Sequence, residues 1–496
     1  MEEGASPWTI LWVLLVGYFM ILVDSTIVSI AIPSIITDLH ATVAGAAWVS
    51  SAYLLAYAVP ILISARLGDR LGQRSMYIGG LLIFTGASLG CGLAGSLTGL
   101  VLARCVQGLG ASAIMPQPLA VITRLIPADR RGPALACWSA VGGIAGMVGP
   151  QIGGLIVGAL GWHWIFLINL PIGILGIYLA VKIIPSLPTT ARQLDIVGVA
   201  LSGVAFFLLV FGIQEGPQYR WSNVVGPFTV CHFIVAGVVL LMGFVGWQAC
   251  CSAEPLVPLR LFGHRSFVMG CVSLASTSFA ITSLMLLLML DAQQGMGDSP
   301  TQAALLFLPI TVVTGTVAQG VGRLSLKVDL RYLAGAGFVI LITSLIFLGK
   351  VLSDSGPVWC VLVLLGGTGF GAAFISTPVS VGALRRLPLD LAGAGAGVFT
   401  ASRLLAAVFG SACTAAIMES KLSGRTSGLA ITGSPAERSA RFAVAVGDAV
   451  YLPVLLLIAG FLASVCLGGS VVHSAESRLV ARRTRTPVPT VNDVDS

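Results

Sequence analysis

The sequence predicts an all-α polytopic membrane protein, and two observations lead to that fold class. Of its 496 residues, 56% are hydrophobic and only 9% are charged, whereas an ordinary soluble domain has about 25% charged residues. The apolar residues also form long runs, each close to or above the roughly 20 residues that a helix needs to cross a bilayer. We therefore expect one polytopic unit in place of several soluble domains.

Fourteen apolar runs, separated by charged residues, glycine or proline, are the predicted transmembrane helices. In chain order they are 9–35, 45–65, 75–94, 97–123, 133–159, 162–184, 194–214, 224–247, 266–290, 301–321, 332–350, 357–384, 391–418 and 447–472. The first run is not a signal peptide, because Glu2 and Glu3 stand where positive charge is expected and the run exceeds an apolar region of about 7 to 15 residues.

The distribution of Lys and Arg predicts the orientation of these helices, because cytoplasmic loops collect basic residues. With both termini cytoplasmic, 19 of the 27 basic residues lie on the cytoplasmic side, and most of the outer ones fall in a single loop, 419–446. Adding or removing one helix would invert every later loop and spoil this partition. The even count and the cytoplasmic termini are therefore expected together.

Several function classes are disfavoured by the same sequence. The net charge of +7 comes from short scattered clusters, with no basic face for nucleic acid. The ten cysteines show no C-x-x-C spacing, and the five histidines form no cluster, so neither a metal site nor another cofactor is expected. Without a phosphate-binding loop or a sizeable soluble domain, the chain is not expected to be an enzyme or to use ATP directly.

The segment 65–74 carries the first motif, Ala-Arg-Leu-Gly-Asp-Arg-Leu-Gly-Gln-Arg. Its glycines permit a tight turn between two helices, and Asp69 can accept hydrogen bonds from Arg70, Arg74 or a neighbouring helix N-terminus. We interpret Asp69, Arg70, Gly72 and Arg74 as a cytoplasmic latch. An ordinary basic loop would explain the arginines but not an aspartate framed by glycines.

This segment resembles the loop signature of the major facilitator superfamily, from which it departs at Ala65 and Gln73. Residues 22–33, 104–110 and 146–154 are similar to motifs of the fourteen-span drug:proton antiporters in that superfamily. The resemblance continues through residues 162–171 and 293–300, although Asp291 stands where those proteins commonly have Tyr. Together these stretches cover spans 1 to 13.

The resemblance implies two six-helix halves around a central cavity, with an inserted helix pair between them. The expected parts are 1–184 and 251–472 as the halves, 185–250 as the inserted pair with its linkers, and 473–496 as a cytoplasmic tail. The implied function is proton-coupled export of lipophilic small molecules such as drugs or antibiotics across the cytoplasmic membrane of a bacterium. Protons are the coupling ion, and the bilayer and small-molecule substrates are the partners.

Asp24 and Arg104 are the predicted proton-coupling residues. A carboxylate in mid-membrane costs about 2.5 to 3.5 kcal/mol on insertion scales, so it persists only with water, a partner or a proton. Counted at 1.5 Å per residue, both side chains reach the outer half of the membrane at similar depth. Arg104 can then pair with Asp24, and a rearrangement during transport can separate the two side chains.

Two further groups of residues are predicted functional positions. Gly146, Gly149, Pro150, Gly153 and Gly154 form an expected bending seam of span 5, or alternatively a simple helix-packing surface.

Asp291, Gln293 and Arg403 are predicted substrate-cavity residues. Structural alternatives stay open for them: Asp291 as an ordinary acid at the outer interface, and Arg403 as a packing residue between the halves. The excess of deep Arg over Asp predicts a preference for neutral or singly charged amphiphiles over dications.

Three other functions remain open at this stage. The first is a dedicated exporter of one lipid, siderophore or self-made antibiotic. The second is a membrane sensor or scaffold that no longer transports, which should have lost Asp24 and Arg104. The third is a proton-driven importer such as a peptide symporter, which the exporter-type motif of span 5 disfavours.

Overall fold

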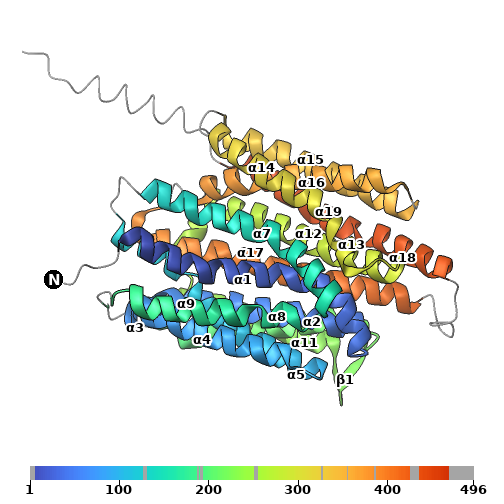
Figure 1. Cartoon of the computed structure of the whole chain (residues 1–496), viewed down its shortest axis with the longest axis horizontal. Coiled ribbons are helices and arrows are strands. Elements are labelled where there is room, and N and C mark those ends of the chain that lie inside the picture. The colour runs from blue at the N-terminus through green and yellow to red at the C-terminus, as the bar shows by residue number, and fades with distance from the viewer. Residues whose placement is uncertain are drawn as a thin grey trace, which may run out of the picture.

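The computed structural model describes residues 6–126, 131–186, 189, 194–250, 255–325, 328–354, 356–384, 387–424 and 435–467. Almost all of them are helical, and the long helices run side by side along one axis of the molecule (Figure 1). The expected tail 473–496 lies outside the described residues.

The described residues form helices and one short β-hairpin, given in chain order. They are α1 (Pro7–Asp38), α2 (Val43–Ala58), α3 (Ile61–Leu71), α4 (Gln73–Gly92), α5 (Leu97–Ile114), α6 (Gln117–Leu125), α7 (Arg131–Leu160), α8 (Trp164–Leu167), α9 (Asn169–Ile183), α10 (Ile196–Glu215), β1 (Asn223–Val225), β2 (Phe228–Thr229), α11 (Val230–Cys250), η1 (Leu259–Gly263), α12 (Arg265–Leu290), η2 (Asp291–Gly295), α13 (Pro300–Leu305), α14 (Leu308–Leu324), α15 (Leu330–Ser353), α16 (Val358–Leu384), α17 (Leu389–Gly424), α18 (Pro435–Ala449) and α19 (Tyr451–Val465).

Each of the fourteen predicted apolar runs overlaps a helix in the part of the chain that the structure describes. Within the described ranges, twelve helices are long and apolar enough to cross a membrane. A thirteenth is obtained when α2 and α3, which are bent by 53° around Pro60, are counted as one span. The part of α7 from Ile144 to Leu160 is a shorter apolar helix.

Two predicted boundaries are wrong. The span expected at 224–247 begins only at Val230, because the residues before it form the antiparallel hairpin β1–β2. The loop expected at 419–446 is largely helical where it is described, since α17 continues to Gly424 and α18 starts at Pro435. Phe442 and Val446 of α18 are buried in a hydrophobic cluster, which explains why this charged segment folds back onto the protein.

The helices pack in two groups. The first helix group is α1–α9, in which α1 packs on α7 and α9, and α5 packs on α2 and α4. The second helix group is α12–α19, in which α12 packs on α16, α17 and α19. Between them in the chain, α10 and α11 pack on each other, and α10 also packs against α2 and α17. We call these two helices the inserted pair, the name used for the prediction.

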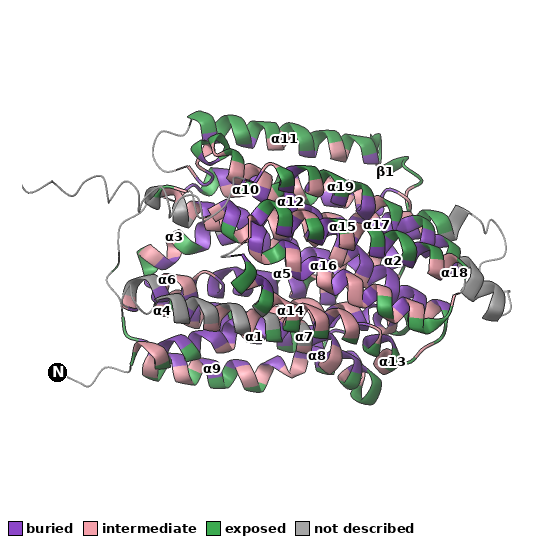
Figure 2. Cartoon of the chain, turned by 90° about the horizontal axis from the view of Figure 1, so that it is seen from above, coloured by how far each residue is buried: buried purple, intermediate pink, exposed green. Residues whose placement is uncertain are grey.

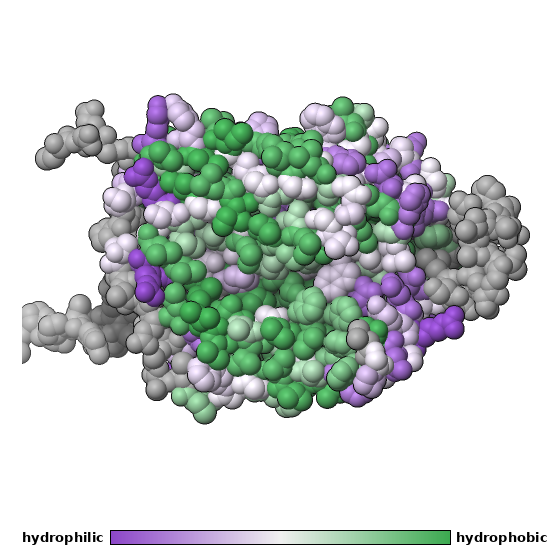
Figure 3. Space-filling view, turned by 90° about the horizontal axis from the view of Figure 1, so that it is seen from below, coloured by the Kyte–Doolittle hydropathy of each residue, from purple (hydrophilic) through white to green (hydrophobic). Residues whose placement is uncertain are grey.

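The helix bundle has two ends, which we call the N-terminal end and the hairpin end. The N-terminal end contains the start of α1 together with α3, and the hairpin end contains β1–β2, α13 and α18 (Figure 1). Buried residues concentrate between the helix groups, while α11 lies at one edge and is exposed along much of its length (Figure 2). Figure 3 shows hydrophobic side chains across the middle of one face and hydrophilic ones at both ends, as a bilayer requires.

Asp195 fixes the inserted pair to the start of the second helix group. Its carboxylate caps α10 by accepting from the backbone N–H of Gly198 at 2.8 Å. It also accepts from Trp247 Nε1 at 2.9 Å and Gln248 Nε2 at 2.6 Å, both on α11. The backbone N–H of Leu256 donates to the same carboxylate at 3.4 Å, so one side chain joins three segments.

Candidate functional site

Asp24 lies in the middle of α1 and is only 1% exposed. One carboxylate oxygen accepts from a guanidinium nitrogen of Arg104 at 2.6 Å. The other accepts from Gln107 Nε2 at 3.0 Å and Asn169 Nδ2 at 2.9 Å. Three donors from α5 and α9 therefore converge on one acid, which is the arrangement that suits an ionised carboxylate.

Arg104 is also 1% exposed, and its Nε and one terminal nitrogen have hydrogen-bond partners. It donates to the Val49 carbonyl at 3.0 Å and to Gln107 Oε1 at 2.5 Å. Its guanidinium carbon lies 3.9 Å from the centre of the Tyr53 ring, a cation–π contact. Because the two buried charges are paired with each other, removing either one would leave a buried unpaired charge and cost several kcal/mol.

The contact between Asp24 and Arg104 agrees with the equal depths that the sequence predicts. Sequence reasoning did not assign a role to Gln107, Asn169 or Ser88, whose hydroxyl accepts from Gln107 Nε2 at 2.8 Å. All three are polar residues inside apolar helices, and this was the signal that could have identified them. Gln107 and Asn169 converge on Asp24, and Ser88 binds both of them. This arrangement depends on helix rotation, which the sequence does not provide.

The predicted latch lies at the N-terminal end, between α3 and α4. Gly72, with φ of +90°, is the single residue between these helices, as the tight turn requires. Asp69 accepts from Gln73 Nε2 at 3.3 Å. Arg74 donates to the Val181 carbonyl at 2.6 Å, so it ties α4 to α9. Arg70, in the last turn of α3, follows Asp69 directly.

The span 5 glycines lack side chains, so α7 can approach both α1 of the first helix group and α13 of the second closely. A Cβ atom at Gly149 or Gly153 would collide with Thr26 or Ile27 of α1. At Gly154 it would collide with Ala304 of α13, across the boundary between the groups. A Cβ atom at Gly146 would have no described atom within 4 Å outside the local helix backbone, so no close helix contact requires a glycine there.

Pro150 is buried within α7, which continues as a helix on both sides of it. The packing role of the glycines is therefore visible in the structure, and bending at this position stays a prediction.

At the hairpin end, hydrogen bonds close the boundary between the helix groups. Gln293 Nε2 donates to the Ile30 carbonyl at 3.0 Å. The Thr301 hydroxyl donates to the Gly154 carbonyl at 3.0 Å. With the close contact of Gly154 and α13, these bonds form what we call the hairpin-end seal.

The inserted pair contacts α2 next to this seal. Gln214 Nε2 donates to the Ala44 carbonyl at 2.9 Å, and its Oε1 accepts from the Ser51 hydroxyl at 2.9 Å. Glu215 accepts from Trp48 Nε1 at 2.7 Å. These polar contacts fix α10 to the first helix group beside the boundary with α17.

Asp291 differs from the exposed interfacial acid that its depth suggested, because it is only 2% exposed. The chain continues past Leu290 as the π-helical turn η2, and α18 packs over that turn. Gly295 leaves room there, since a Cβ would lie 2.9 Å from Asp291 Oδ1 and 3.0 Å from Phe442 Cβ. The burial was missed because α18 was assigned to a loop.

Arg403 lies at the boundary between the helix groups and is partly exposed. It is at mid-length of α17, whereas Asp291 and Gln293 belong to η2 at the hairpin end. The assignment of these three residues to a substrate cavity stays a prediction.

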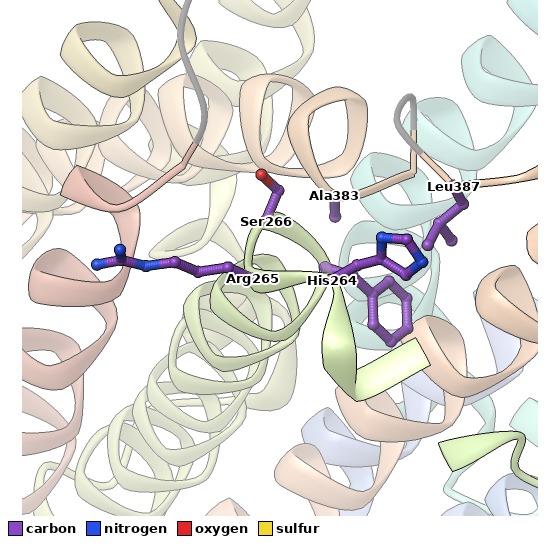
Figure 4. Close-up of a pocket in the computed structure, with 6 residues that line it drawn as sticks. His264, Arg265, Ser266, Ala383 and Leu387 are labelled. Atoms are coloured by element: carbon purple, nitrogen blue, oxygen red, sulfur yellow. The ribbon is translucent and has the colours of Figure 1, made fainter. Parts of the chain in front are cut away.

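One pocket lies at the N-terminal end, lined by residues at the start of α12 and around the end of α16. Figure 4 shows the His264 ring turned toward Leu387, with the Arg265 side chain turned away from it. Arg265 donates to Cys466 Sγ at 3.4 Å instead. Among the described residues, no group of three or more His, Cys, Asp or Glu side chains could hold a metal ion.

A family model described as Major Facilitator Superfamily matches residues 14–411, which include Asp24, Arg104 and the predicted latch. The chain belongs to the major facilitator superfamily. The fold and the family are those of membrane transporters, and the chain is a multi-pass protein of a bacterial membrane.

Curated members of the major facilitator superfamily are similar to this chain over most of its length. An uncharacterized MFS-type transporter of Mycobacterium tuberculosis is 41% identical, over 93% of this chain and 81% of the relative. The multidrug resistance protein Stp of the same species is 33% identical, over 82% and 75%. The tetracenomycin C resistance and export protein of Streptomyces glaucescens is 30% identical, over 84% and 77%.

Solved structures of the major facilitator superfamily share the fold. A bacterial homolog of the human lysosomal transporter Spinster, in an inward-facing and unoccupied conformation, superposes with a TM-score of 0.63. The match covers 93% of this chain and 97% of the other at 17% identity. At that identity the likeness establishes the fold alone.

Proposed function

We propose that this chain is a proton-coupled antiporter that exports lipophilic small molecules across the cytoplasmic membrane by alternating access. The observation that carries the proposal is the buried pair of Asp24 and Arg104, which is a titratable group with a removable partner inside the first helix group. Relatives named for multidrug resistance and for antibiotic resistance and export support the direction of transport.

The proposed architecture is that of the fourteen-span drug:proton antiporters. α2 with α3 counts as one span and α7 as another, which brings the twelve long helices to the predicted number. The two helix groups are then the two halves, and α10 and α11 are the inserted pair. Placing both termini in the cytoplasm puts the hairpin end outside, in keeping with the basic residues of the opposite loops.

In this orientation the structure represents an outward-closed state, sealed by Gln293, Thr301 and Gly154. Asp24 is then ionised and bound to Arg104. When the seal opens, outside water reaches Asp24, and a proton on its carboxyl weakens the bonds from Arg104, Gln107 and Asn169 because the neutral group is a poorer acceptor. Return to the outward-closed state restores those bonds, and the proton leaves toward the cytoplasm, which completes the exchange.

A dedicated exporter of one self-made antibiotic is the second candidate function. It is favoured by the similarity to a protein named for resistance to, and export of, a single antibiotic. Both candidates use the same proton-coupled cycle, and they differ only in how many compounds are exported.

Efflux from proteoliposomes tests the proposal. A panel of dyes and antibiotics is loaded, and an imposed proton gradient should drive their transport together with counter-movement of protons. Adding a protonophore should abolish both the transport of the compounds and the counter-movement of protons. Transport that continues unchanged without a proton gradient would refute proton coupling, and transport of a single compound from the panel would favour the dedicated exporter.

A further inference from the structure

Arg403 is a cation without an anionic partner in the part of the chain that the structure describes. It lies on α17 of the second helix group, at mid-length of that helix. Two tyrosines of the first helix group, Tyr18 on α1 and Tyr57 on α2, belong to the same buried cluster as Ala401 and Leu404, which flank Arg403 on α17. A positive charge is therefore held at the boundary between the groups, with aromatic side chains opposite it.

The neighbouring polar atoms are donors that lack acceptors. Tyr57 is 1% exposed, and its hydroxyl has no hydrogen-bond partner among the described residues. Trp138 of α7 stacks on Tyr18 with ring centres 5.2 Å apart, and its buried indole N–H also has no partner in the described part of the chain. An indole N–H and a guanidinium can only donate, and a phenol donates readily. Unmet donors of this kind are costly unless an acceptor arrives.

We propose that Arg403, Tyr57 and Trp138 bind the anionic group of an aromatic substrate, whose ring system packs against the stacked pair of Tyr18 and Trp138. The ligand class is a singly charged aromatic carboxylate or acidic phenol. A guanidinium pairs with a carboxylate through two parallel hydrogen bonds, and planar rings stack on Tyr and Trp. This inference rests on the proposed function and names its substrate class.

The charge balance of the core favours an anion over a cation. Arg104 is already neutralised by Asp24 through a contact of 2.6 Å. Among the described residues, the other buried acids, Asp195, Glu215 and Asp291, lie at or beyond the ends of their helices, whereas Arg403 is at mid-length of α17. A cationic substrate beside Arg403 would meet an uncompensated like charge in a medium of low dielectric, whereas an anion would neutralise it.

The proposed site is adjacent to the proton-coupling pair. Tyr57 and Tyr53 occupy successive turns of α2, with ring centres 6.0 Å apart. Tyr53 in turn covers the guanidinium of Arg104. A ligand that moves Tyr57 therefore acts on the residue that covers Arg104, so substrate binding and proton binding can influence each other through one helix.

Binding of three matched probes to the purified protein tests this inference. Anthracene-9-carboxylate, anthracene-9-methanol and anthracene-9-methylamine share one ring system and differ in charge. Equilibrium dialysis should give the lowest Kd for the carboxylate, by about tenfold or more over the neutral alcohol, as one charge-assisted pair implies. Equal Kd values for the three probes would overturn the proposal.

Variants separate charge recognition from general structural damage. Arg403→Gln should remove most of the preference for the carboxylate and leave the Kd of the alcohol unchanged, while Arg403→Lys should keep part of it. Tyr57→Phe and Trp138→Phe keep an aromatic ring and remove one donor, so each should weaken only the carboxylate. The matched control is Arg331→Gln, because Arg331 is exposed and pairs with Asp329 at the end of the bundle. A carboxylate preference that survives Arg403→Gln would overturn the assignment.

The same experiment distinguishes failure of this inference from failure of the proposed function. Proton-driven efflux of a cationic dye that is unaffected by Arg403→Gln, together with equal probe affinities, would refute the anion site and leave the antiporter intact. An Arg403-dependent preference for the carboxylate without any proton-driven transport would refute the antiporter and leave the anion site intact.

Discussion

Ser51 of α2 and Ser411 of α17 are hydrogen-bonded at 3.1 Å across the boundary between the two helix groups. Both residues are buried, and Ser51 also donates to Gln214 of the inserted pair. One small side chain therefore contacts all three parts of the transporter. The inserted pair is positioned to influence opening of the hairpin end.

Loss of this bond should favour opening at the hairpin end. A net hydrogen bond contributes about 0.5 to 1.5 kcal/mol, so Ser411→Ala should raise the open population about two- to tenfold. Hydrogen–deuterium exchange of peptides from α2 would report it as faster exchange. Ser420→Ala is the matched control, because Ser420 lies on the same helix and donates only to the Ile417 carbonyl. Equal exchange in the two variants would contradict the role of Ser411.

Asp24→Asn should abolish proton-coupled efflux without preventing membrane insertion. The amide cannot take up a transported proton. It leaves the buried Arg104 unpaired at a cost of several kcal/mol, but the length and apolar character of each span, which direct insertion, are unchanged. Efflux in proteoliposomes and the amount of protein in the membrane are the two measurements. Asp448→Asn serves as the control, because Asp448 is an exposed acid that pairs with Lys421 at 2.6 Å. Wild-type efflux by Asp24→Asn at equal expression would exclude Asp24 from proton coupling.

Asp69→Asn should slow the transport cycle more than it weakens substrate binding. Asp69 lies in the last turns of α3, at the N-terminal end and away from the boundary residues Arg403 and Tyr57. Turnover at saturating substrate should fall severalfold, with Kd unchanged, because the carboxylate that accepts from Gln73 holds two helix ends together. A tenfold loss of affinity with unchanged turnover would contradict the latch.

Gly154→Val should prevent closure of the hairpin end. The new side chain would collide with Ala304 and with the Pro300 carbonyl, and a contact between backbones leaves little room for relaxation. Efflux should fall about tenfold or more, since each cycle must pass through the closed state. Gly146→Val is a control on the same helix, where a Cβ atom would have no described atom within 4 Å outside the local helix backbone. Similar losses in both variants would indicate general damage to α7.

The pH dependence of stability should identify the role of Asp195. Burial opposes its charged form, but hydrogen bonds from Gln248, Gly198, Trp247 and Leu256 outweigh burial and hold the pKa of Asp195 below its usual value of 3.8. A lowered pKa in the folded state means that the stabilisation is present above the usual value and is lost as the pH falls through the folded one.

Asp195→Asn should therefore lower the Tm by an amount that is constant between about pH 5 and pH 8 and shrinks below about pH 4. Thermal unfolding in detergent at each pH provides the measurement. Asp448→Asn, which changes an exposed acid, should have little effect at any pH. A difference in Tm between Asp195→Asn and the unmodified protein that grows as the pH falls would contradict the stabilising role of the Asp195 carboxylate.

The sequence was sufficient where apolar runs and residue depth decide the structure. Most of the predicted apolar runs coincide with long helices, because bilayer thickness sets their length. The similar depth of Asp24 and Arg104 made their contact geometrically possible. Asp291 was misjudged because the charged residues of 435–441 made that segment look like a loop, whereas the apolar face of α18 covers the acid. Whether a donor such as Asn169 faces Asp24 depends on the rotation of its helix about the helix axis. The sequence of an almost uniformly apolar helix does not encode that rotation.

The hydrogen bonds of Asp195 also have a consequence for biogenesis. The carboxylate and its partner at Leu256 are separated by both helices of the inserted pair, so the ribosome must synthesise that pair before the last bond can form. Until then the linker that leads into the second helix group is unanchored. Asp195 thus marks the point in translation at which the inserted pair becomes fixed and the remaining helices start from a defined position.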